Sequence, residues 1–494
     1  MGLIQRQGIK SSIVSYTGVI IGFISTLFVY PLDWELYGSI QYWITSATIL
    51  TPILRQGSTA LINKFYPRFK KDGIKGFMGM IILITTVTII GMSIFLLLIG
   101  ILFQNTSFIR GLNIDSSNVL YVYLLAIIMI YSTSFQYHAA NMRRIVVPDI
   151  ISKIGYKLIN IIIILLVYFN IMDDSWSAPL LITLYLFAGF LMVTYLKSLN
   201  KLNIFGFKFS SLDRQIKKSL FRYWIFGGLN YLGILLAYKI DLFMIGTFVN
   251  KESVGYYSLF LYMSNLMIIP MASINAISGP IIAESFEHND IKYIDEIYKK
   301  SSNNILVFGA IVFLLIWVNL PFLLEIMRNG KELIPLTTIL LLLGLSKIFD
   351  LMTSINNLIM IYSKWYHVNL ILLLIMATCN IILNTLFIDL YGILGAAVAT
   401  LISVFTFNLL KTGFIFIKLN IQPITKNTLY ILSILTLGLL LTTYLHNITI
   451  LNPVISIGIY TVLVSAIFLP IFYFLKLSPE LNGLLDKLIR KVKR

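Results

Sequence analysis

Long apolar segments recur along the whole chain and are separated by short polar stretches. About fourteen such segments of roughly 18 to 28 residues are each long enough to cross a hydrocarbon core of about 30 Å. They begin near Ile13, Leu36, Phe77, Asn118, Ile150, Ala178, Arg222, Val254, Asn304, Leu333, Trp365, Tyr391, Leu429 and Val454. The pattern predicts an all-α polytopic membrane protein with about 14 transmembrane helices.

The composition agrees with this class, because 58% of the 494 residues are hydrophobic and 12% are charged. Cys379 is the single cysteine of the chain, so no intramolecular disulfide forms.

The net charge of +17 follows the predicted topology. Basic clusters such as "KFYPRFKK", "NMRRIVV" and "LIRKVKR" fall in alternate loops, which the positive-inside rule places in the cytoplasm. We therefore expect a multi-pass protein with both termini cytoplasmic, in contact with anionic membrane lipids. Nucleic acid is not an expected partner.

An internal repeat links the two halves of the chain. "DWELYGSIQYW" from Asp33 and "NKESVGYYSLF" from Asn250 pair Gly38 with Gly255 at an offset of 217. Pro52 and Pro270 continue the series, as do "NIII" at Asn160 and "NIIL" at Asn380. Because six helices are duplicated, both copies enter the membrane in the same direction, which is typical of transporters built from parallel repeats.

The repeat divides the chain into two parallel-repeat six-helix lobes plus two extra C-terminal helices. The lobes are expected at residues 1–200 and 201–420, the two additional helices at 421–477, and a basic amphipathic cytoplasmic tail at 478–494. In the tail, Ser478 and Pro479 suit a helix start. An apolar stripe follows, formed by Leu481, Leu484, Leu485, Leu488 and Val492.

Catalytic and metal-binding motifs are absent from the sequence. The four histidines are scattered, and neither HExxH, CxxC nor a phosphate-binding GxxxxGK[ST] loop occurs. We expect neither an enzyme nor a bound metal or other cofactor.

Charges inside the predicted spans are the candidate functional residues, because a central charge costs about 2.5–3.5 kcal/mol on insertion scales and so faces a bundle interior or a watery cavity. Arg55, Lys239 and Lys347 are interpreted as cations that line a cavity for an anionic substrate. Asp241 and Asp350 are candidates for binding a coupling ion, H⁺ or Na⁺. Transport driven by the membrane potential alone is an alternative to ion coupling.

Each of these charges also has a structural interpretation. Lys347 and Asp350, three residues apart on one helical face, would neutralise each other. Lys239 would extend to the outer interface, and Asp241 would cap backbone or pair locally. Lys239 and Asp241 lie about 200° apart around an ideal helix, so a simple mutual salt bridge is not expected. Arg55 has no acid within four residues and is the strongest candidate.

Several stretches are similar to one protein family. "IDLFMIGTFVNKESVGYYSL", "IIPMASINAISGPIIAESF", "YGILGAAVATLIS" and "YGSIQYWITSATILTPILRQGSTALINKFYP" resemble the polysaccharide biosynthesis flippases of the multidrug/oligosaccharidyl-lipid/polysaccharide exporter superfamily. The similarity covers nearly the whole chain, although the motifs are loose.

This resemblance implies export of a polyprenyl-diphosphate-linked oligosaccharide, for surface polysaccharide such as lipopolysaccharide O-antigen, across a bacterial inner membrane by alternating access. Contacts with other glycan assembly proteins would accompany that role. In such proteins cationic cavity residues meet the diphosphate or acidic sugars, and Arg55 best matches that role by position.

The sequence is also compatible with two rival functions. A cation-coupled multidrug antiporter of the same superfamily would need carboxylates in the amino-terminal lobe, where acids near the spans, such as Asp33 and Glu35, are expected at the outer ends. A membrane-embedded glycan polymerase or acyltransferase would need a large outer loop or buried histidines.

Overall fold

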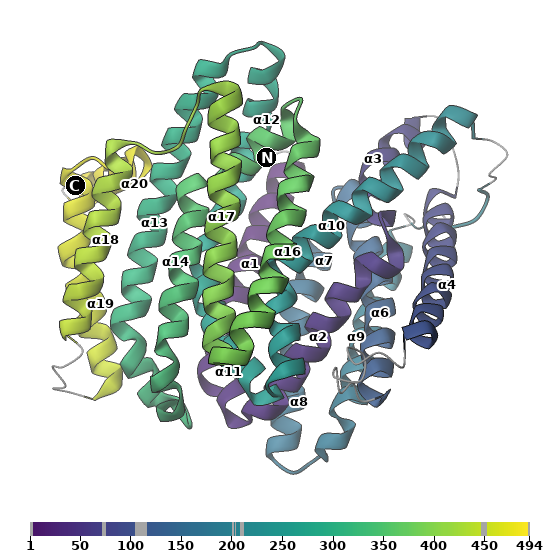
Figure 1. The fold of residues 1–494 in the computed structure, drawn as a ribbon, viewed down its shortest axis with the longest axis horizontal. Coiled ribbons are helices and arrows are strands. Elements are labelled where there is room, and N and C mark those ends of the chain that lie inside the picture. Colours follow the sequence, from purple (N-terminus) through teal and green to yellow (C-terminus); the bar gives the residue numbers. More distant parts are fainter. Residues whose placement is uncertain are drawn as a thin grey trace. The chain divides into compact units, whose positions relative to one another are not determined.

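The computed structural model is a set of long helices joined by short turns (Figure 1). It describes residues 3–71, 76–103, 116–199, 202, 204–207, 212–445 and 452–492. All regular secondary structure in these ranges is helical, as the apolar pattern predicts. The chain divides into two compact units, Met1–Gly255 and Tyr256–Arg494.

The first unit is built around α2 and α6. Helix α2 packs against α6 and α10, while α6 also packs against α3 and α9. Its helices are α1 (Leu3–Phe28), η1 (Tyr30–Leu32), α2 (Trp34–Arg55), α3 (Ser58–Lys71), α4 (Phe77–Phe103), α6 (Ser116–Asn141), α7 (Val146–Asp149), the π-helical η2 (Ile150–Gly155), α8 (Tyr156–Tyr168), η3 (Asp174–Trp176), α9 (Ser177–Ser198) and α10 (Arg214–Phe248).

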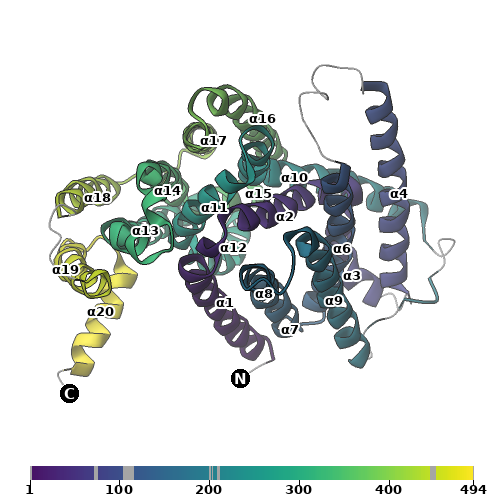
Figure 2. The same ribbon diagram turned by 90° about the horizontal axis from the view of Figure 1, so that it is seen from below.

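The second unit is built around α13 and α17. Helix α13 packs against α14, α18 and α19, and α17 packs against α14 and α16 (Figure 2). The helices are α11 (Lys251–Asn265), which begins in the first unit, η5 (Leu266–Ile268), α12 (Met271–Glu287), α13 (Ile291–Ile326), η6 (Gly330–Leu336), α14 (Thr337–Thr353), α15 (Asn356–Tyr362), α16 (Tyr366–Tyr391), α17 (Ile393–Leu419), α18 (Lys426–Leu445), α19 (Pro453–Phe474) and α20 (Pro479–Val492).

The exact count of fourteen membrane spans is not confirmed. Within the described ranges twelve helices are long and apolar enough to cross a membrane, or thirteen if the bent pair α11–α12 is one span. The segment predicted from Leu36 folds as α2, which is not among them. Its many Ser, Thr and Gln residues lower its hydropathy, and the helix breaks at Gln56, where φ is +48°.

The two copies of the repeat share their local structure. Asp33 accepts a hydrogen bond from the backbone N–H of Leu36, and Asn250, its equivalent, accepts one from Ser253, so the same side-chain cap begins α2 and α11. Both helices then break near the paired prolines and continue as α3 and α12. The lobe boundaries near 200 and 420 stay a prediction, since the first compact unit extends to Gly255.

The carboxyl-terminal helix α20 begins where the sequence predicted. Ser478 Oγ accepts from the N–H of Leu481, and Tyr473 Oη donates to Asp486 across the turn from α19. The side chains of Leu484, Leu488 and Val492 in the predicted stripe lie outside the described residues.

Candidate substrate-binding site

The break between α2 and α3 brings the backbone of α2 against α10. A Cβ atom at Gly57 would lie 2.1 Å from the carbonyl oxygen of Trp224, and one at Gly228 would lie 2.9 Å from the carbonyl carbon of Gln56. Side chains at either position would separate the helices, so this close approach requires glycine. Tyr231, one turn beyond Gly228, is thereby brought to the end of α2.

Arg55, the last residue of α2, is buried at this break. Its side chain is 1% exposed, and its guanidinium carbon lies 4.8 Å from the centroid of the Tyr231 ring. Among the described residues, the Nε and Nη1 atoms of Arg55 find no hydrogen-bond partner. A buried donor left unpaired costs about 1–3 kcal/mol, and more when it is charged. An anion at this position would therefore be strongly stabilised.

A polar cavity of about 420 Å³ adjoins this arginine through Tyr231. Helix α6 contributes Thr133, Gln136 and Tyr137 to its wall, and Asp149 of α7 contributes a carboxylate. Hydroxyl and amide groups of this kind form the hydrogen bonds that sugars and phosphates require. Three helices therefore bring Arg55 within electrostatic reach of Tyr137 and Tyr231.

Asp149 corrects the expectation that acids of the amino-terminal lobe lie at its outer ends. It is 9% exposed and belongs to the span Val146–Tyr168, because the helix begins four residues earlier than the apolar segment predicted from Ile150. Its carboxylate accepts hydrogen bonds from Ser11 of α1 and from Lys153 Nζ, the latter at 2.9 Å.

Two lysines also donate hydrogen bonds to residues of α1. Lys153 Nζ also donates to Ser15 Oγ at 2.9 Å, and Lys157 Nζ donates to the carbonyl oxygen of Gly18 at 2.6 Å. The sequence interpretation assigned no intramembrane role to these lysines, although both lie inside a span. Lys153 lies in a π-helical segment, a type of irregularity that is frequent at functional sites.

Lys239 and Asp241 occupy different environments on α10. Lys239 is exposed, whereas Asp241 is 4% exposed, which agrees with their separation of about 200° around the helix. Lys239 does not line the cavity next to Arg55. Its position eight residues beyond Tyr231 corresponds to a rise of about 12 Å along α10. The structure does not bring Lys239 together with Arg55 at this cavity.

Lys347 and Asp350 belong to a buried polar cluster in the second unit. Asp350 interacts electrostatically with Lys347 and with Lys411 of α17, so it serves as a counter-ion for two cations. Asn408 Nδ2 donates to Asp350 Oδ1 at 2.8 Å, and Asn408 Oδ1 accepts from Thr353 at 2.8 Å.

Lys411 was missed by the sequence interpretation. It is 2% exposed, and its Nζ atom lies 3.9 Å from the centroid of the Phe407 ring. The sequence does mark Lys411 as a buried cation. It lies two turns before the end of the span Ile393–Leu419 and has no acid within one turn of its helix.

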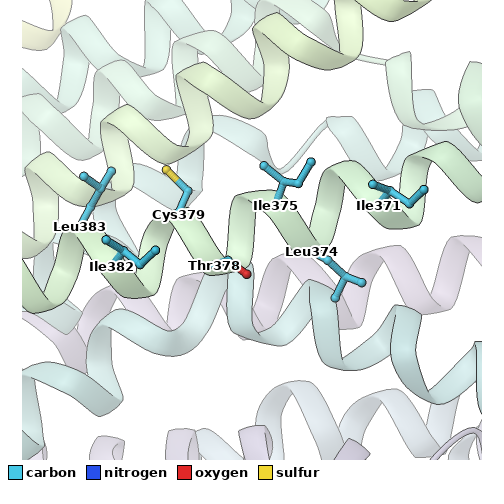
Figure 3. Close-up of a pocket in the computed structure, with 7 residues that line it drawn as sticks. All are labelled: Ile371, Leu374, Ile375, Thr378, Cys379, Ile382 and Leu383. Carbon is cyan, nitrogen blue, oxygen red and sulfur yellow. The ribbon is translucent and has the colours of Figure 1, made fainter.

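A larger cavity of about 520 Å³ lies along α16 and is not a substrate-site candidate. The side chains that line it all come from this single helix (Figure 3). They are almost entirely apolar, with Thr378 and Cys379 as the exceptions. This surface suits contact with lipid chains.

Comparisons with known proteins agree with this architecture. The MatE family model matches residues 228–386. The solved structure of the lipid II flippase MurJ in an inward closed conformation is 18% identical, with a TM-score of 0.68 over 94% of this chain and 99% of that one. A search of the curated proteins found no match.

Two MATE structures have the same fold. An inward-facing multidrug resistance MATE family transporter of the MOP superfamily is 13% identical, with a TM-score of 0.60 over 82% of this chain and 94% of that one. A MATE protein in complex with MaL6 is also 13% identical, with a TM-score of 0.55 over 85% and 97%.

The chain has the fold of these solved structures, which include a lipid II flippase and a multidrug resistance transporter. The MatE match covers residues 228–386, and the fold is shared with a transporter of the MOP superfamily, the multidrug/oligosaccharidyl-lipid/polysaccharide exporters that the sequence resembles.

Proposed function

We propose that this transporter moves a polyprenyl-diphosphate-linked oligosaccharide from the cytoplasmic to the outer face of a bacterial inner membrane, for surface polysaccharide such as lipopolysaccharide O-antigen. The observation that carries the proposal is Arg55, a buried guanidinium whose Nε and Nη1 atoms find no partner among the described residues. A diphosphate supplies the acceptor oxygens and the negative charge that this group lacks.

The adjoining cavity supports the sugar part of this substrate. Gln136, Tyr137 and Tyr231 offer hydrogen-bonding groups beside the arginine, within a unit whose outer surface is apolar. A sugar-diphosphate headgroup cannot cross hydrocarbon unaided, because each polar group without a partner costs several kcal/mol. A polar cavity inside the bundle offsets that cost while the lipid chain stays in the bilayer.

The remaining assignments are part of the same proposal. Lys239 and Lys347 are proposed as further cations on the substrate path, with Asp241 or Asp350 binding a coupling H⁺ or Na⁺. Both termini are proposed to be cytoplasmic, and other glycan assembly proteins are proposed as contacts.

A second candidate function is cation-coupled export of organic cations. Asp149 favours it, because this buried carboxylate lines the same cavity as Tyr231 and would bind a proton, a sodium ion or a cationic drug. Its pairing with Lys153 argues against that role, since the lysine already neutralises it.

Reconstitution into liposomes separates the two functions. For the flippase, a fluorescent polyprenyl-diphosphate oligosaccharide becomes accessible to a membrane-impermeant reagent in the opposite leaflet, and organic cations do not move. Robust movement of organic cations under a proton or sodium gradient, with no lipid translocation, would overturn the proposal in favour of the antiporter.

A further inference from the structure

A groove on the first unit, distinct from the cavity at Tyr231, has the character of a lipid site. It has a volume of about 620 Å³ and lies between α4 and the amino-terminal part of α10, with Leu61 of α3 contributing to its wall. Apart from Lys217, Thr88 and the Trp224 indole, its lining is apolar.

The groove is basic at one end and apolar along the rest. Helices α4 and α10 begin close together, since Phe77 and Met80 of α4 share an apolar cluster with Ile216 and Leu220 of α10. Lys217 lines the groove one turn after the start of α10. The lining of α4 extends away from its start to Met92.

One face of α10 changes from basic to aromatic along its length. Arg214, Lys217, Phe221 and Trp224 recur every three or four residues, so they share a face of the helix. Both basic residues are exposed at the helix start, and the aromatic residues follow one and two turns deeper. Basic side chains beside an apolar surface at a membrane boundary attract anionic headgroups.

A buried donor in the wall points to a ligand independently of the charges. Trp224 Nε1 is buried and finds no hydrogen-bond partner among the described residues. The ester oxygens of a phospholipid lie between its phosphate and its chains, so an ester at this depth would accept this hydrogen bond.

We propose that the groove binds one anionic phospholipid. Its phosphate lies at Lys217 and Arg214, an ester oxygen accepts from Trp224 Nε1, and an acyl chain lies along α4 between Leu83 and Met92. The occupant joins α4 to α10, so it is a structural ligand of the transporter and is independent of the transported substrate.

Native mass spectrometry of the full chain in detergent tests this site. With added phosphatidylglycerol or phosphatidylcholine, the wild type is expected to retain one phosphatidylglycerol with at least tenfold higher affinity. Lys217→Glu is expected to remove this preference. Gly91→Phe, which fills the groove at a glycine with open space around it, is expected to remove retention of either lipid.

A matched control lies on the same helix. Gly100 of α4 also has no neighbour within 4 Å and does not line the groove, so Gly100→Phe is expected to retain phosphatidylglycerol like the wild type. Equal retention of both phospholipids by the wild type, or unchanged binding in Gly91→Phe, would overturn the proposal. So would displacement of phosphatidylglycerol by polyprenyl phosphate at a lower concentration, which would assign the groove to the substrate lipid.

Fluorescence gives a second measurement that does not depend on a bulky variant. Phosphatidylglycerol with brominated chains, added at about one lipid per protein, is expected to quench tryptophan emission. Trp224→Phe is expected to lose most of that quenching. If the quenched fraction is the same in Trp224→Phe as in the wild type, the lipid lies elsewhere.

Discussion

Gly38 and Gly255, equivalent residues of the two repeats, meet in reciprocal contacts. A Cβ atom on Gly38 would lie 1.7 Å from the carbonyl oxygen of Lys251, and one on Gly255 would lie 2.6 Å from that of Trp34. Lys251 and Trp34 are themselves equivalent at the offset of 217. The two equivalent motifs therefore touch, within the first compact unit, through the same two positions.

This contact makes a prediction about stability. Gly38→Ala is expected to separate α2 from α11 and to lower the free energy of unfolding by about 1–3 kcal/mol, the usual cost of overpacking. Gly100→Ala in α4, where nothing lies within 4 Å, is expected to leave it unchanged or raise it by up to about 1 kcal/mol. Thermal unfolding in detergent measures both variants, and equal melting temperatures would show that the contact does not form.

The polar cluster of the second unit predicts a strong coupling between Asp350 and Lys411. Asp350→Asn leaves two buried lysines without their counter-ion and is expected to destabilise the protein by about 3–5 kcal/mol. The double variant Asp350→Asn with Lys411→Met is expected to be more stable than the sum of the single changes. A double-mutant cycle of unfolding free energies measures this coupling, and additive effects would exclude it.

Mutations of Asp149 and Lys153, which both contact α1, distinguish the flippase from the cation-coupled exporter. In the flippase, Asp149 is a structural partner of Lys153, so Asp149→Asn alone is expected to reduce transport. Adding Lys153→Gln is expected to restore transport to at least half of the wild-type rate. Transport assays in liposomes at equal protein abundance measure this, and an inactive double variant would favour a coupling role for the carboxylate.

The sequence predicted the architecture well because membrane insertion imposes a strong pattern. Apolar length placed most of the spans, and the repeat offset paired the two motifs whose first residues, Asp33 and Asn250, cap α2 and α11 in the structure. The exception was α2, where Ser and Thr residues, together with the break at Gln56, weaken the signal of a continuous apolar span.

The candidate site was less predictable, since burial in a membrane protein depends on which face of a helix meets its neighbours. Arg55 stood out as a lone cation in an apolar stretch, and it is buried. Lys239 is also a cation inside a predicted span, but Asp241 follows it two residues later, and Lys239 is exposed. Tyr137 and Tyr231 gave no sequence signal among 28 tyrosines, because the packing of three helices brings them together.

The buried guanidinium of Arg55 is proposed to bind the diphosphate of the transported lipid. The most direct test is the affinity of purified variants for a polyprenyl-diphosphate-linked oligosaccharide. A hydrogen bond to a charged group contributes about 1.5–3 kcal/mol, so Arg55→Ala is expected to bind about 10- to 150-fold more weakly. Arg55→Lys is expected to be intermediate, and Arg68→Ala, at an exposed arginine of α3, is expected to match the wild type. Unchanged affinity in Arg55→Ala, at wild-type stability, would show that this guanidinium does not bind the diphosphate.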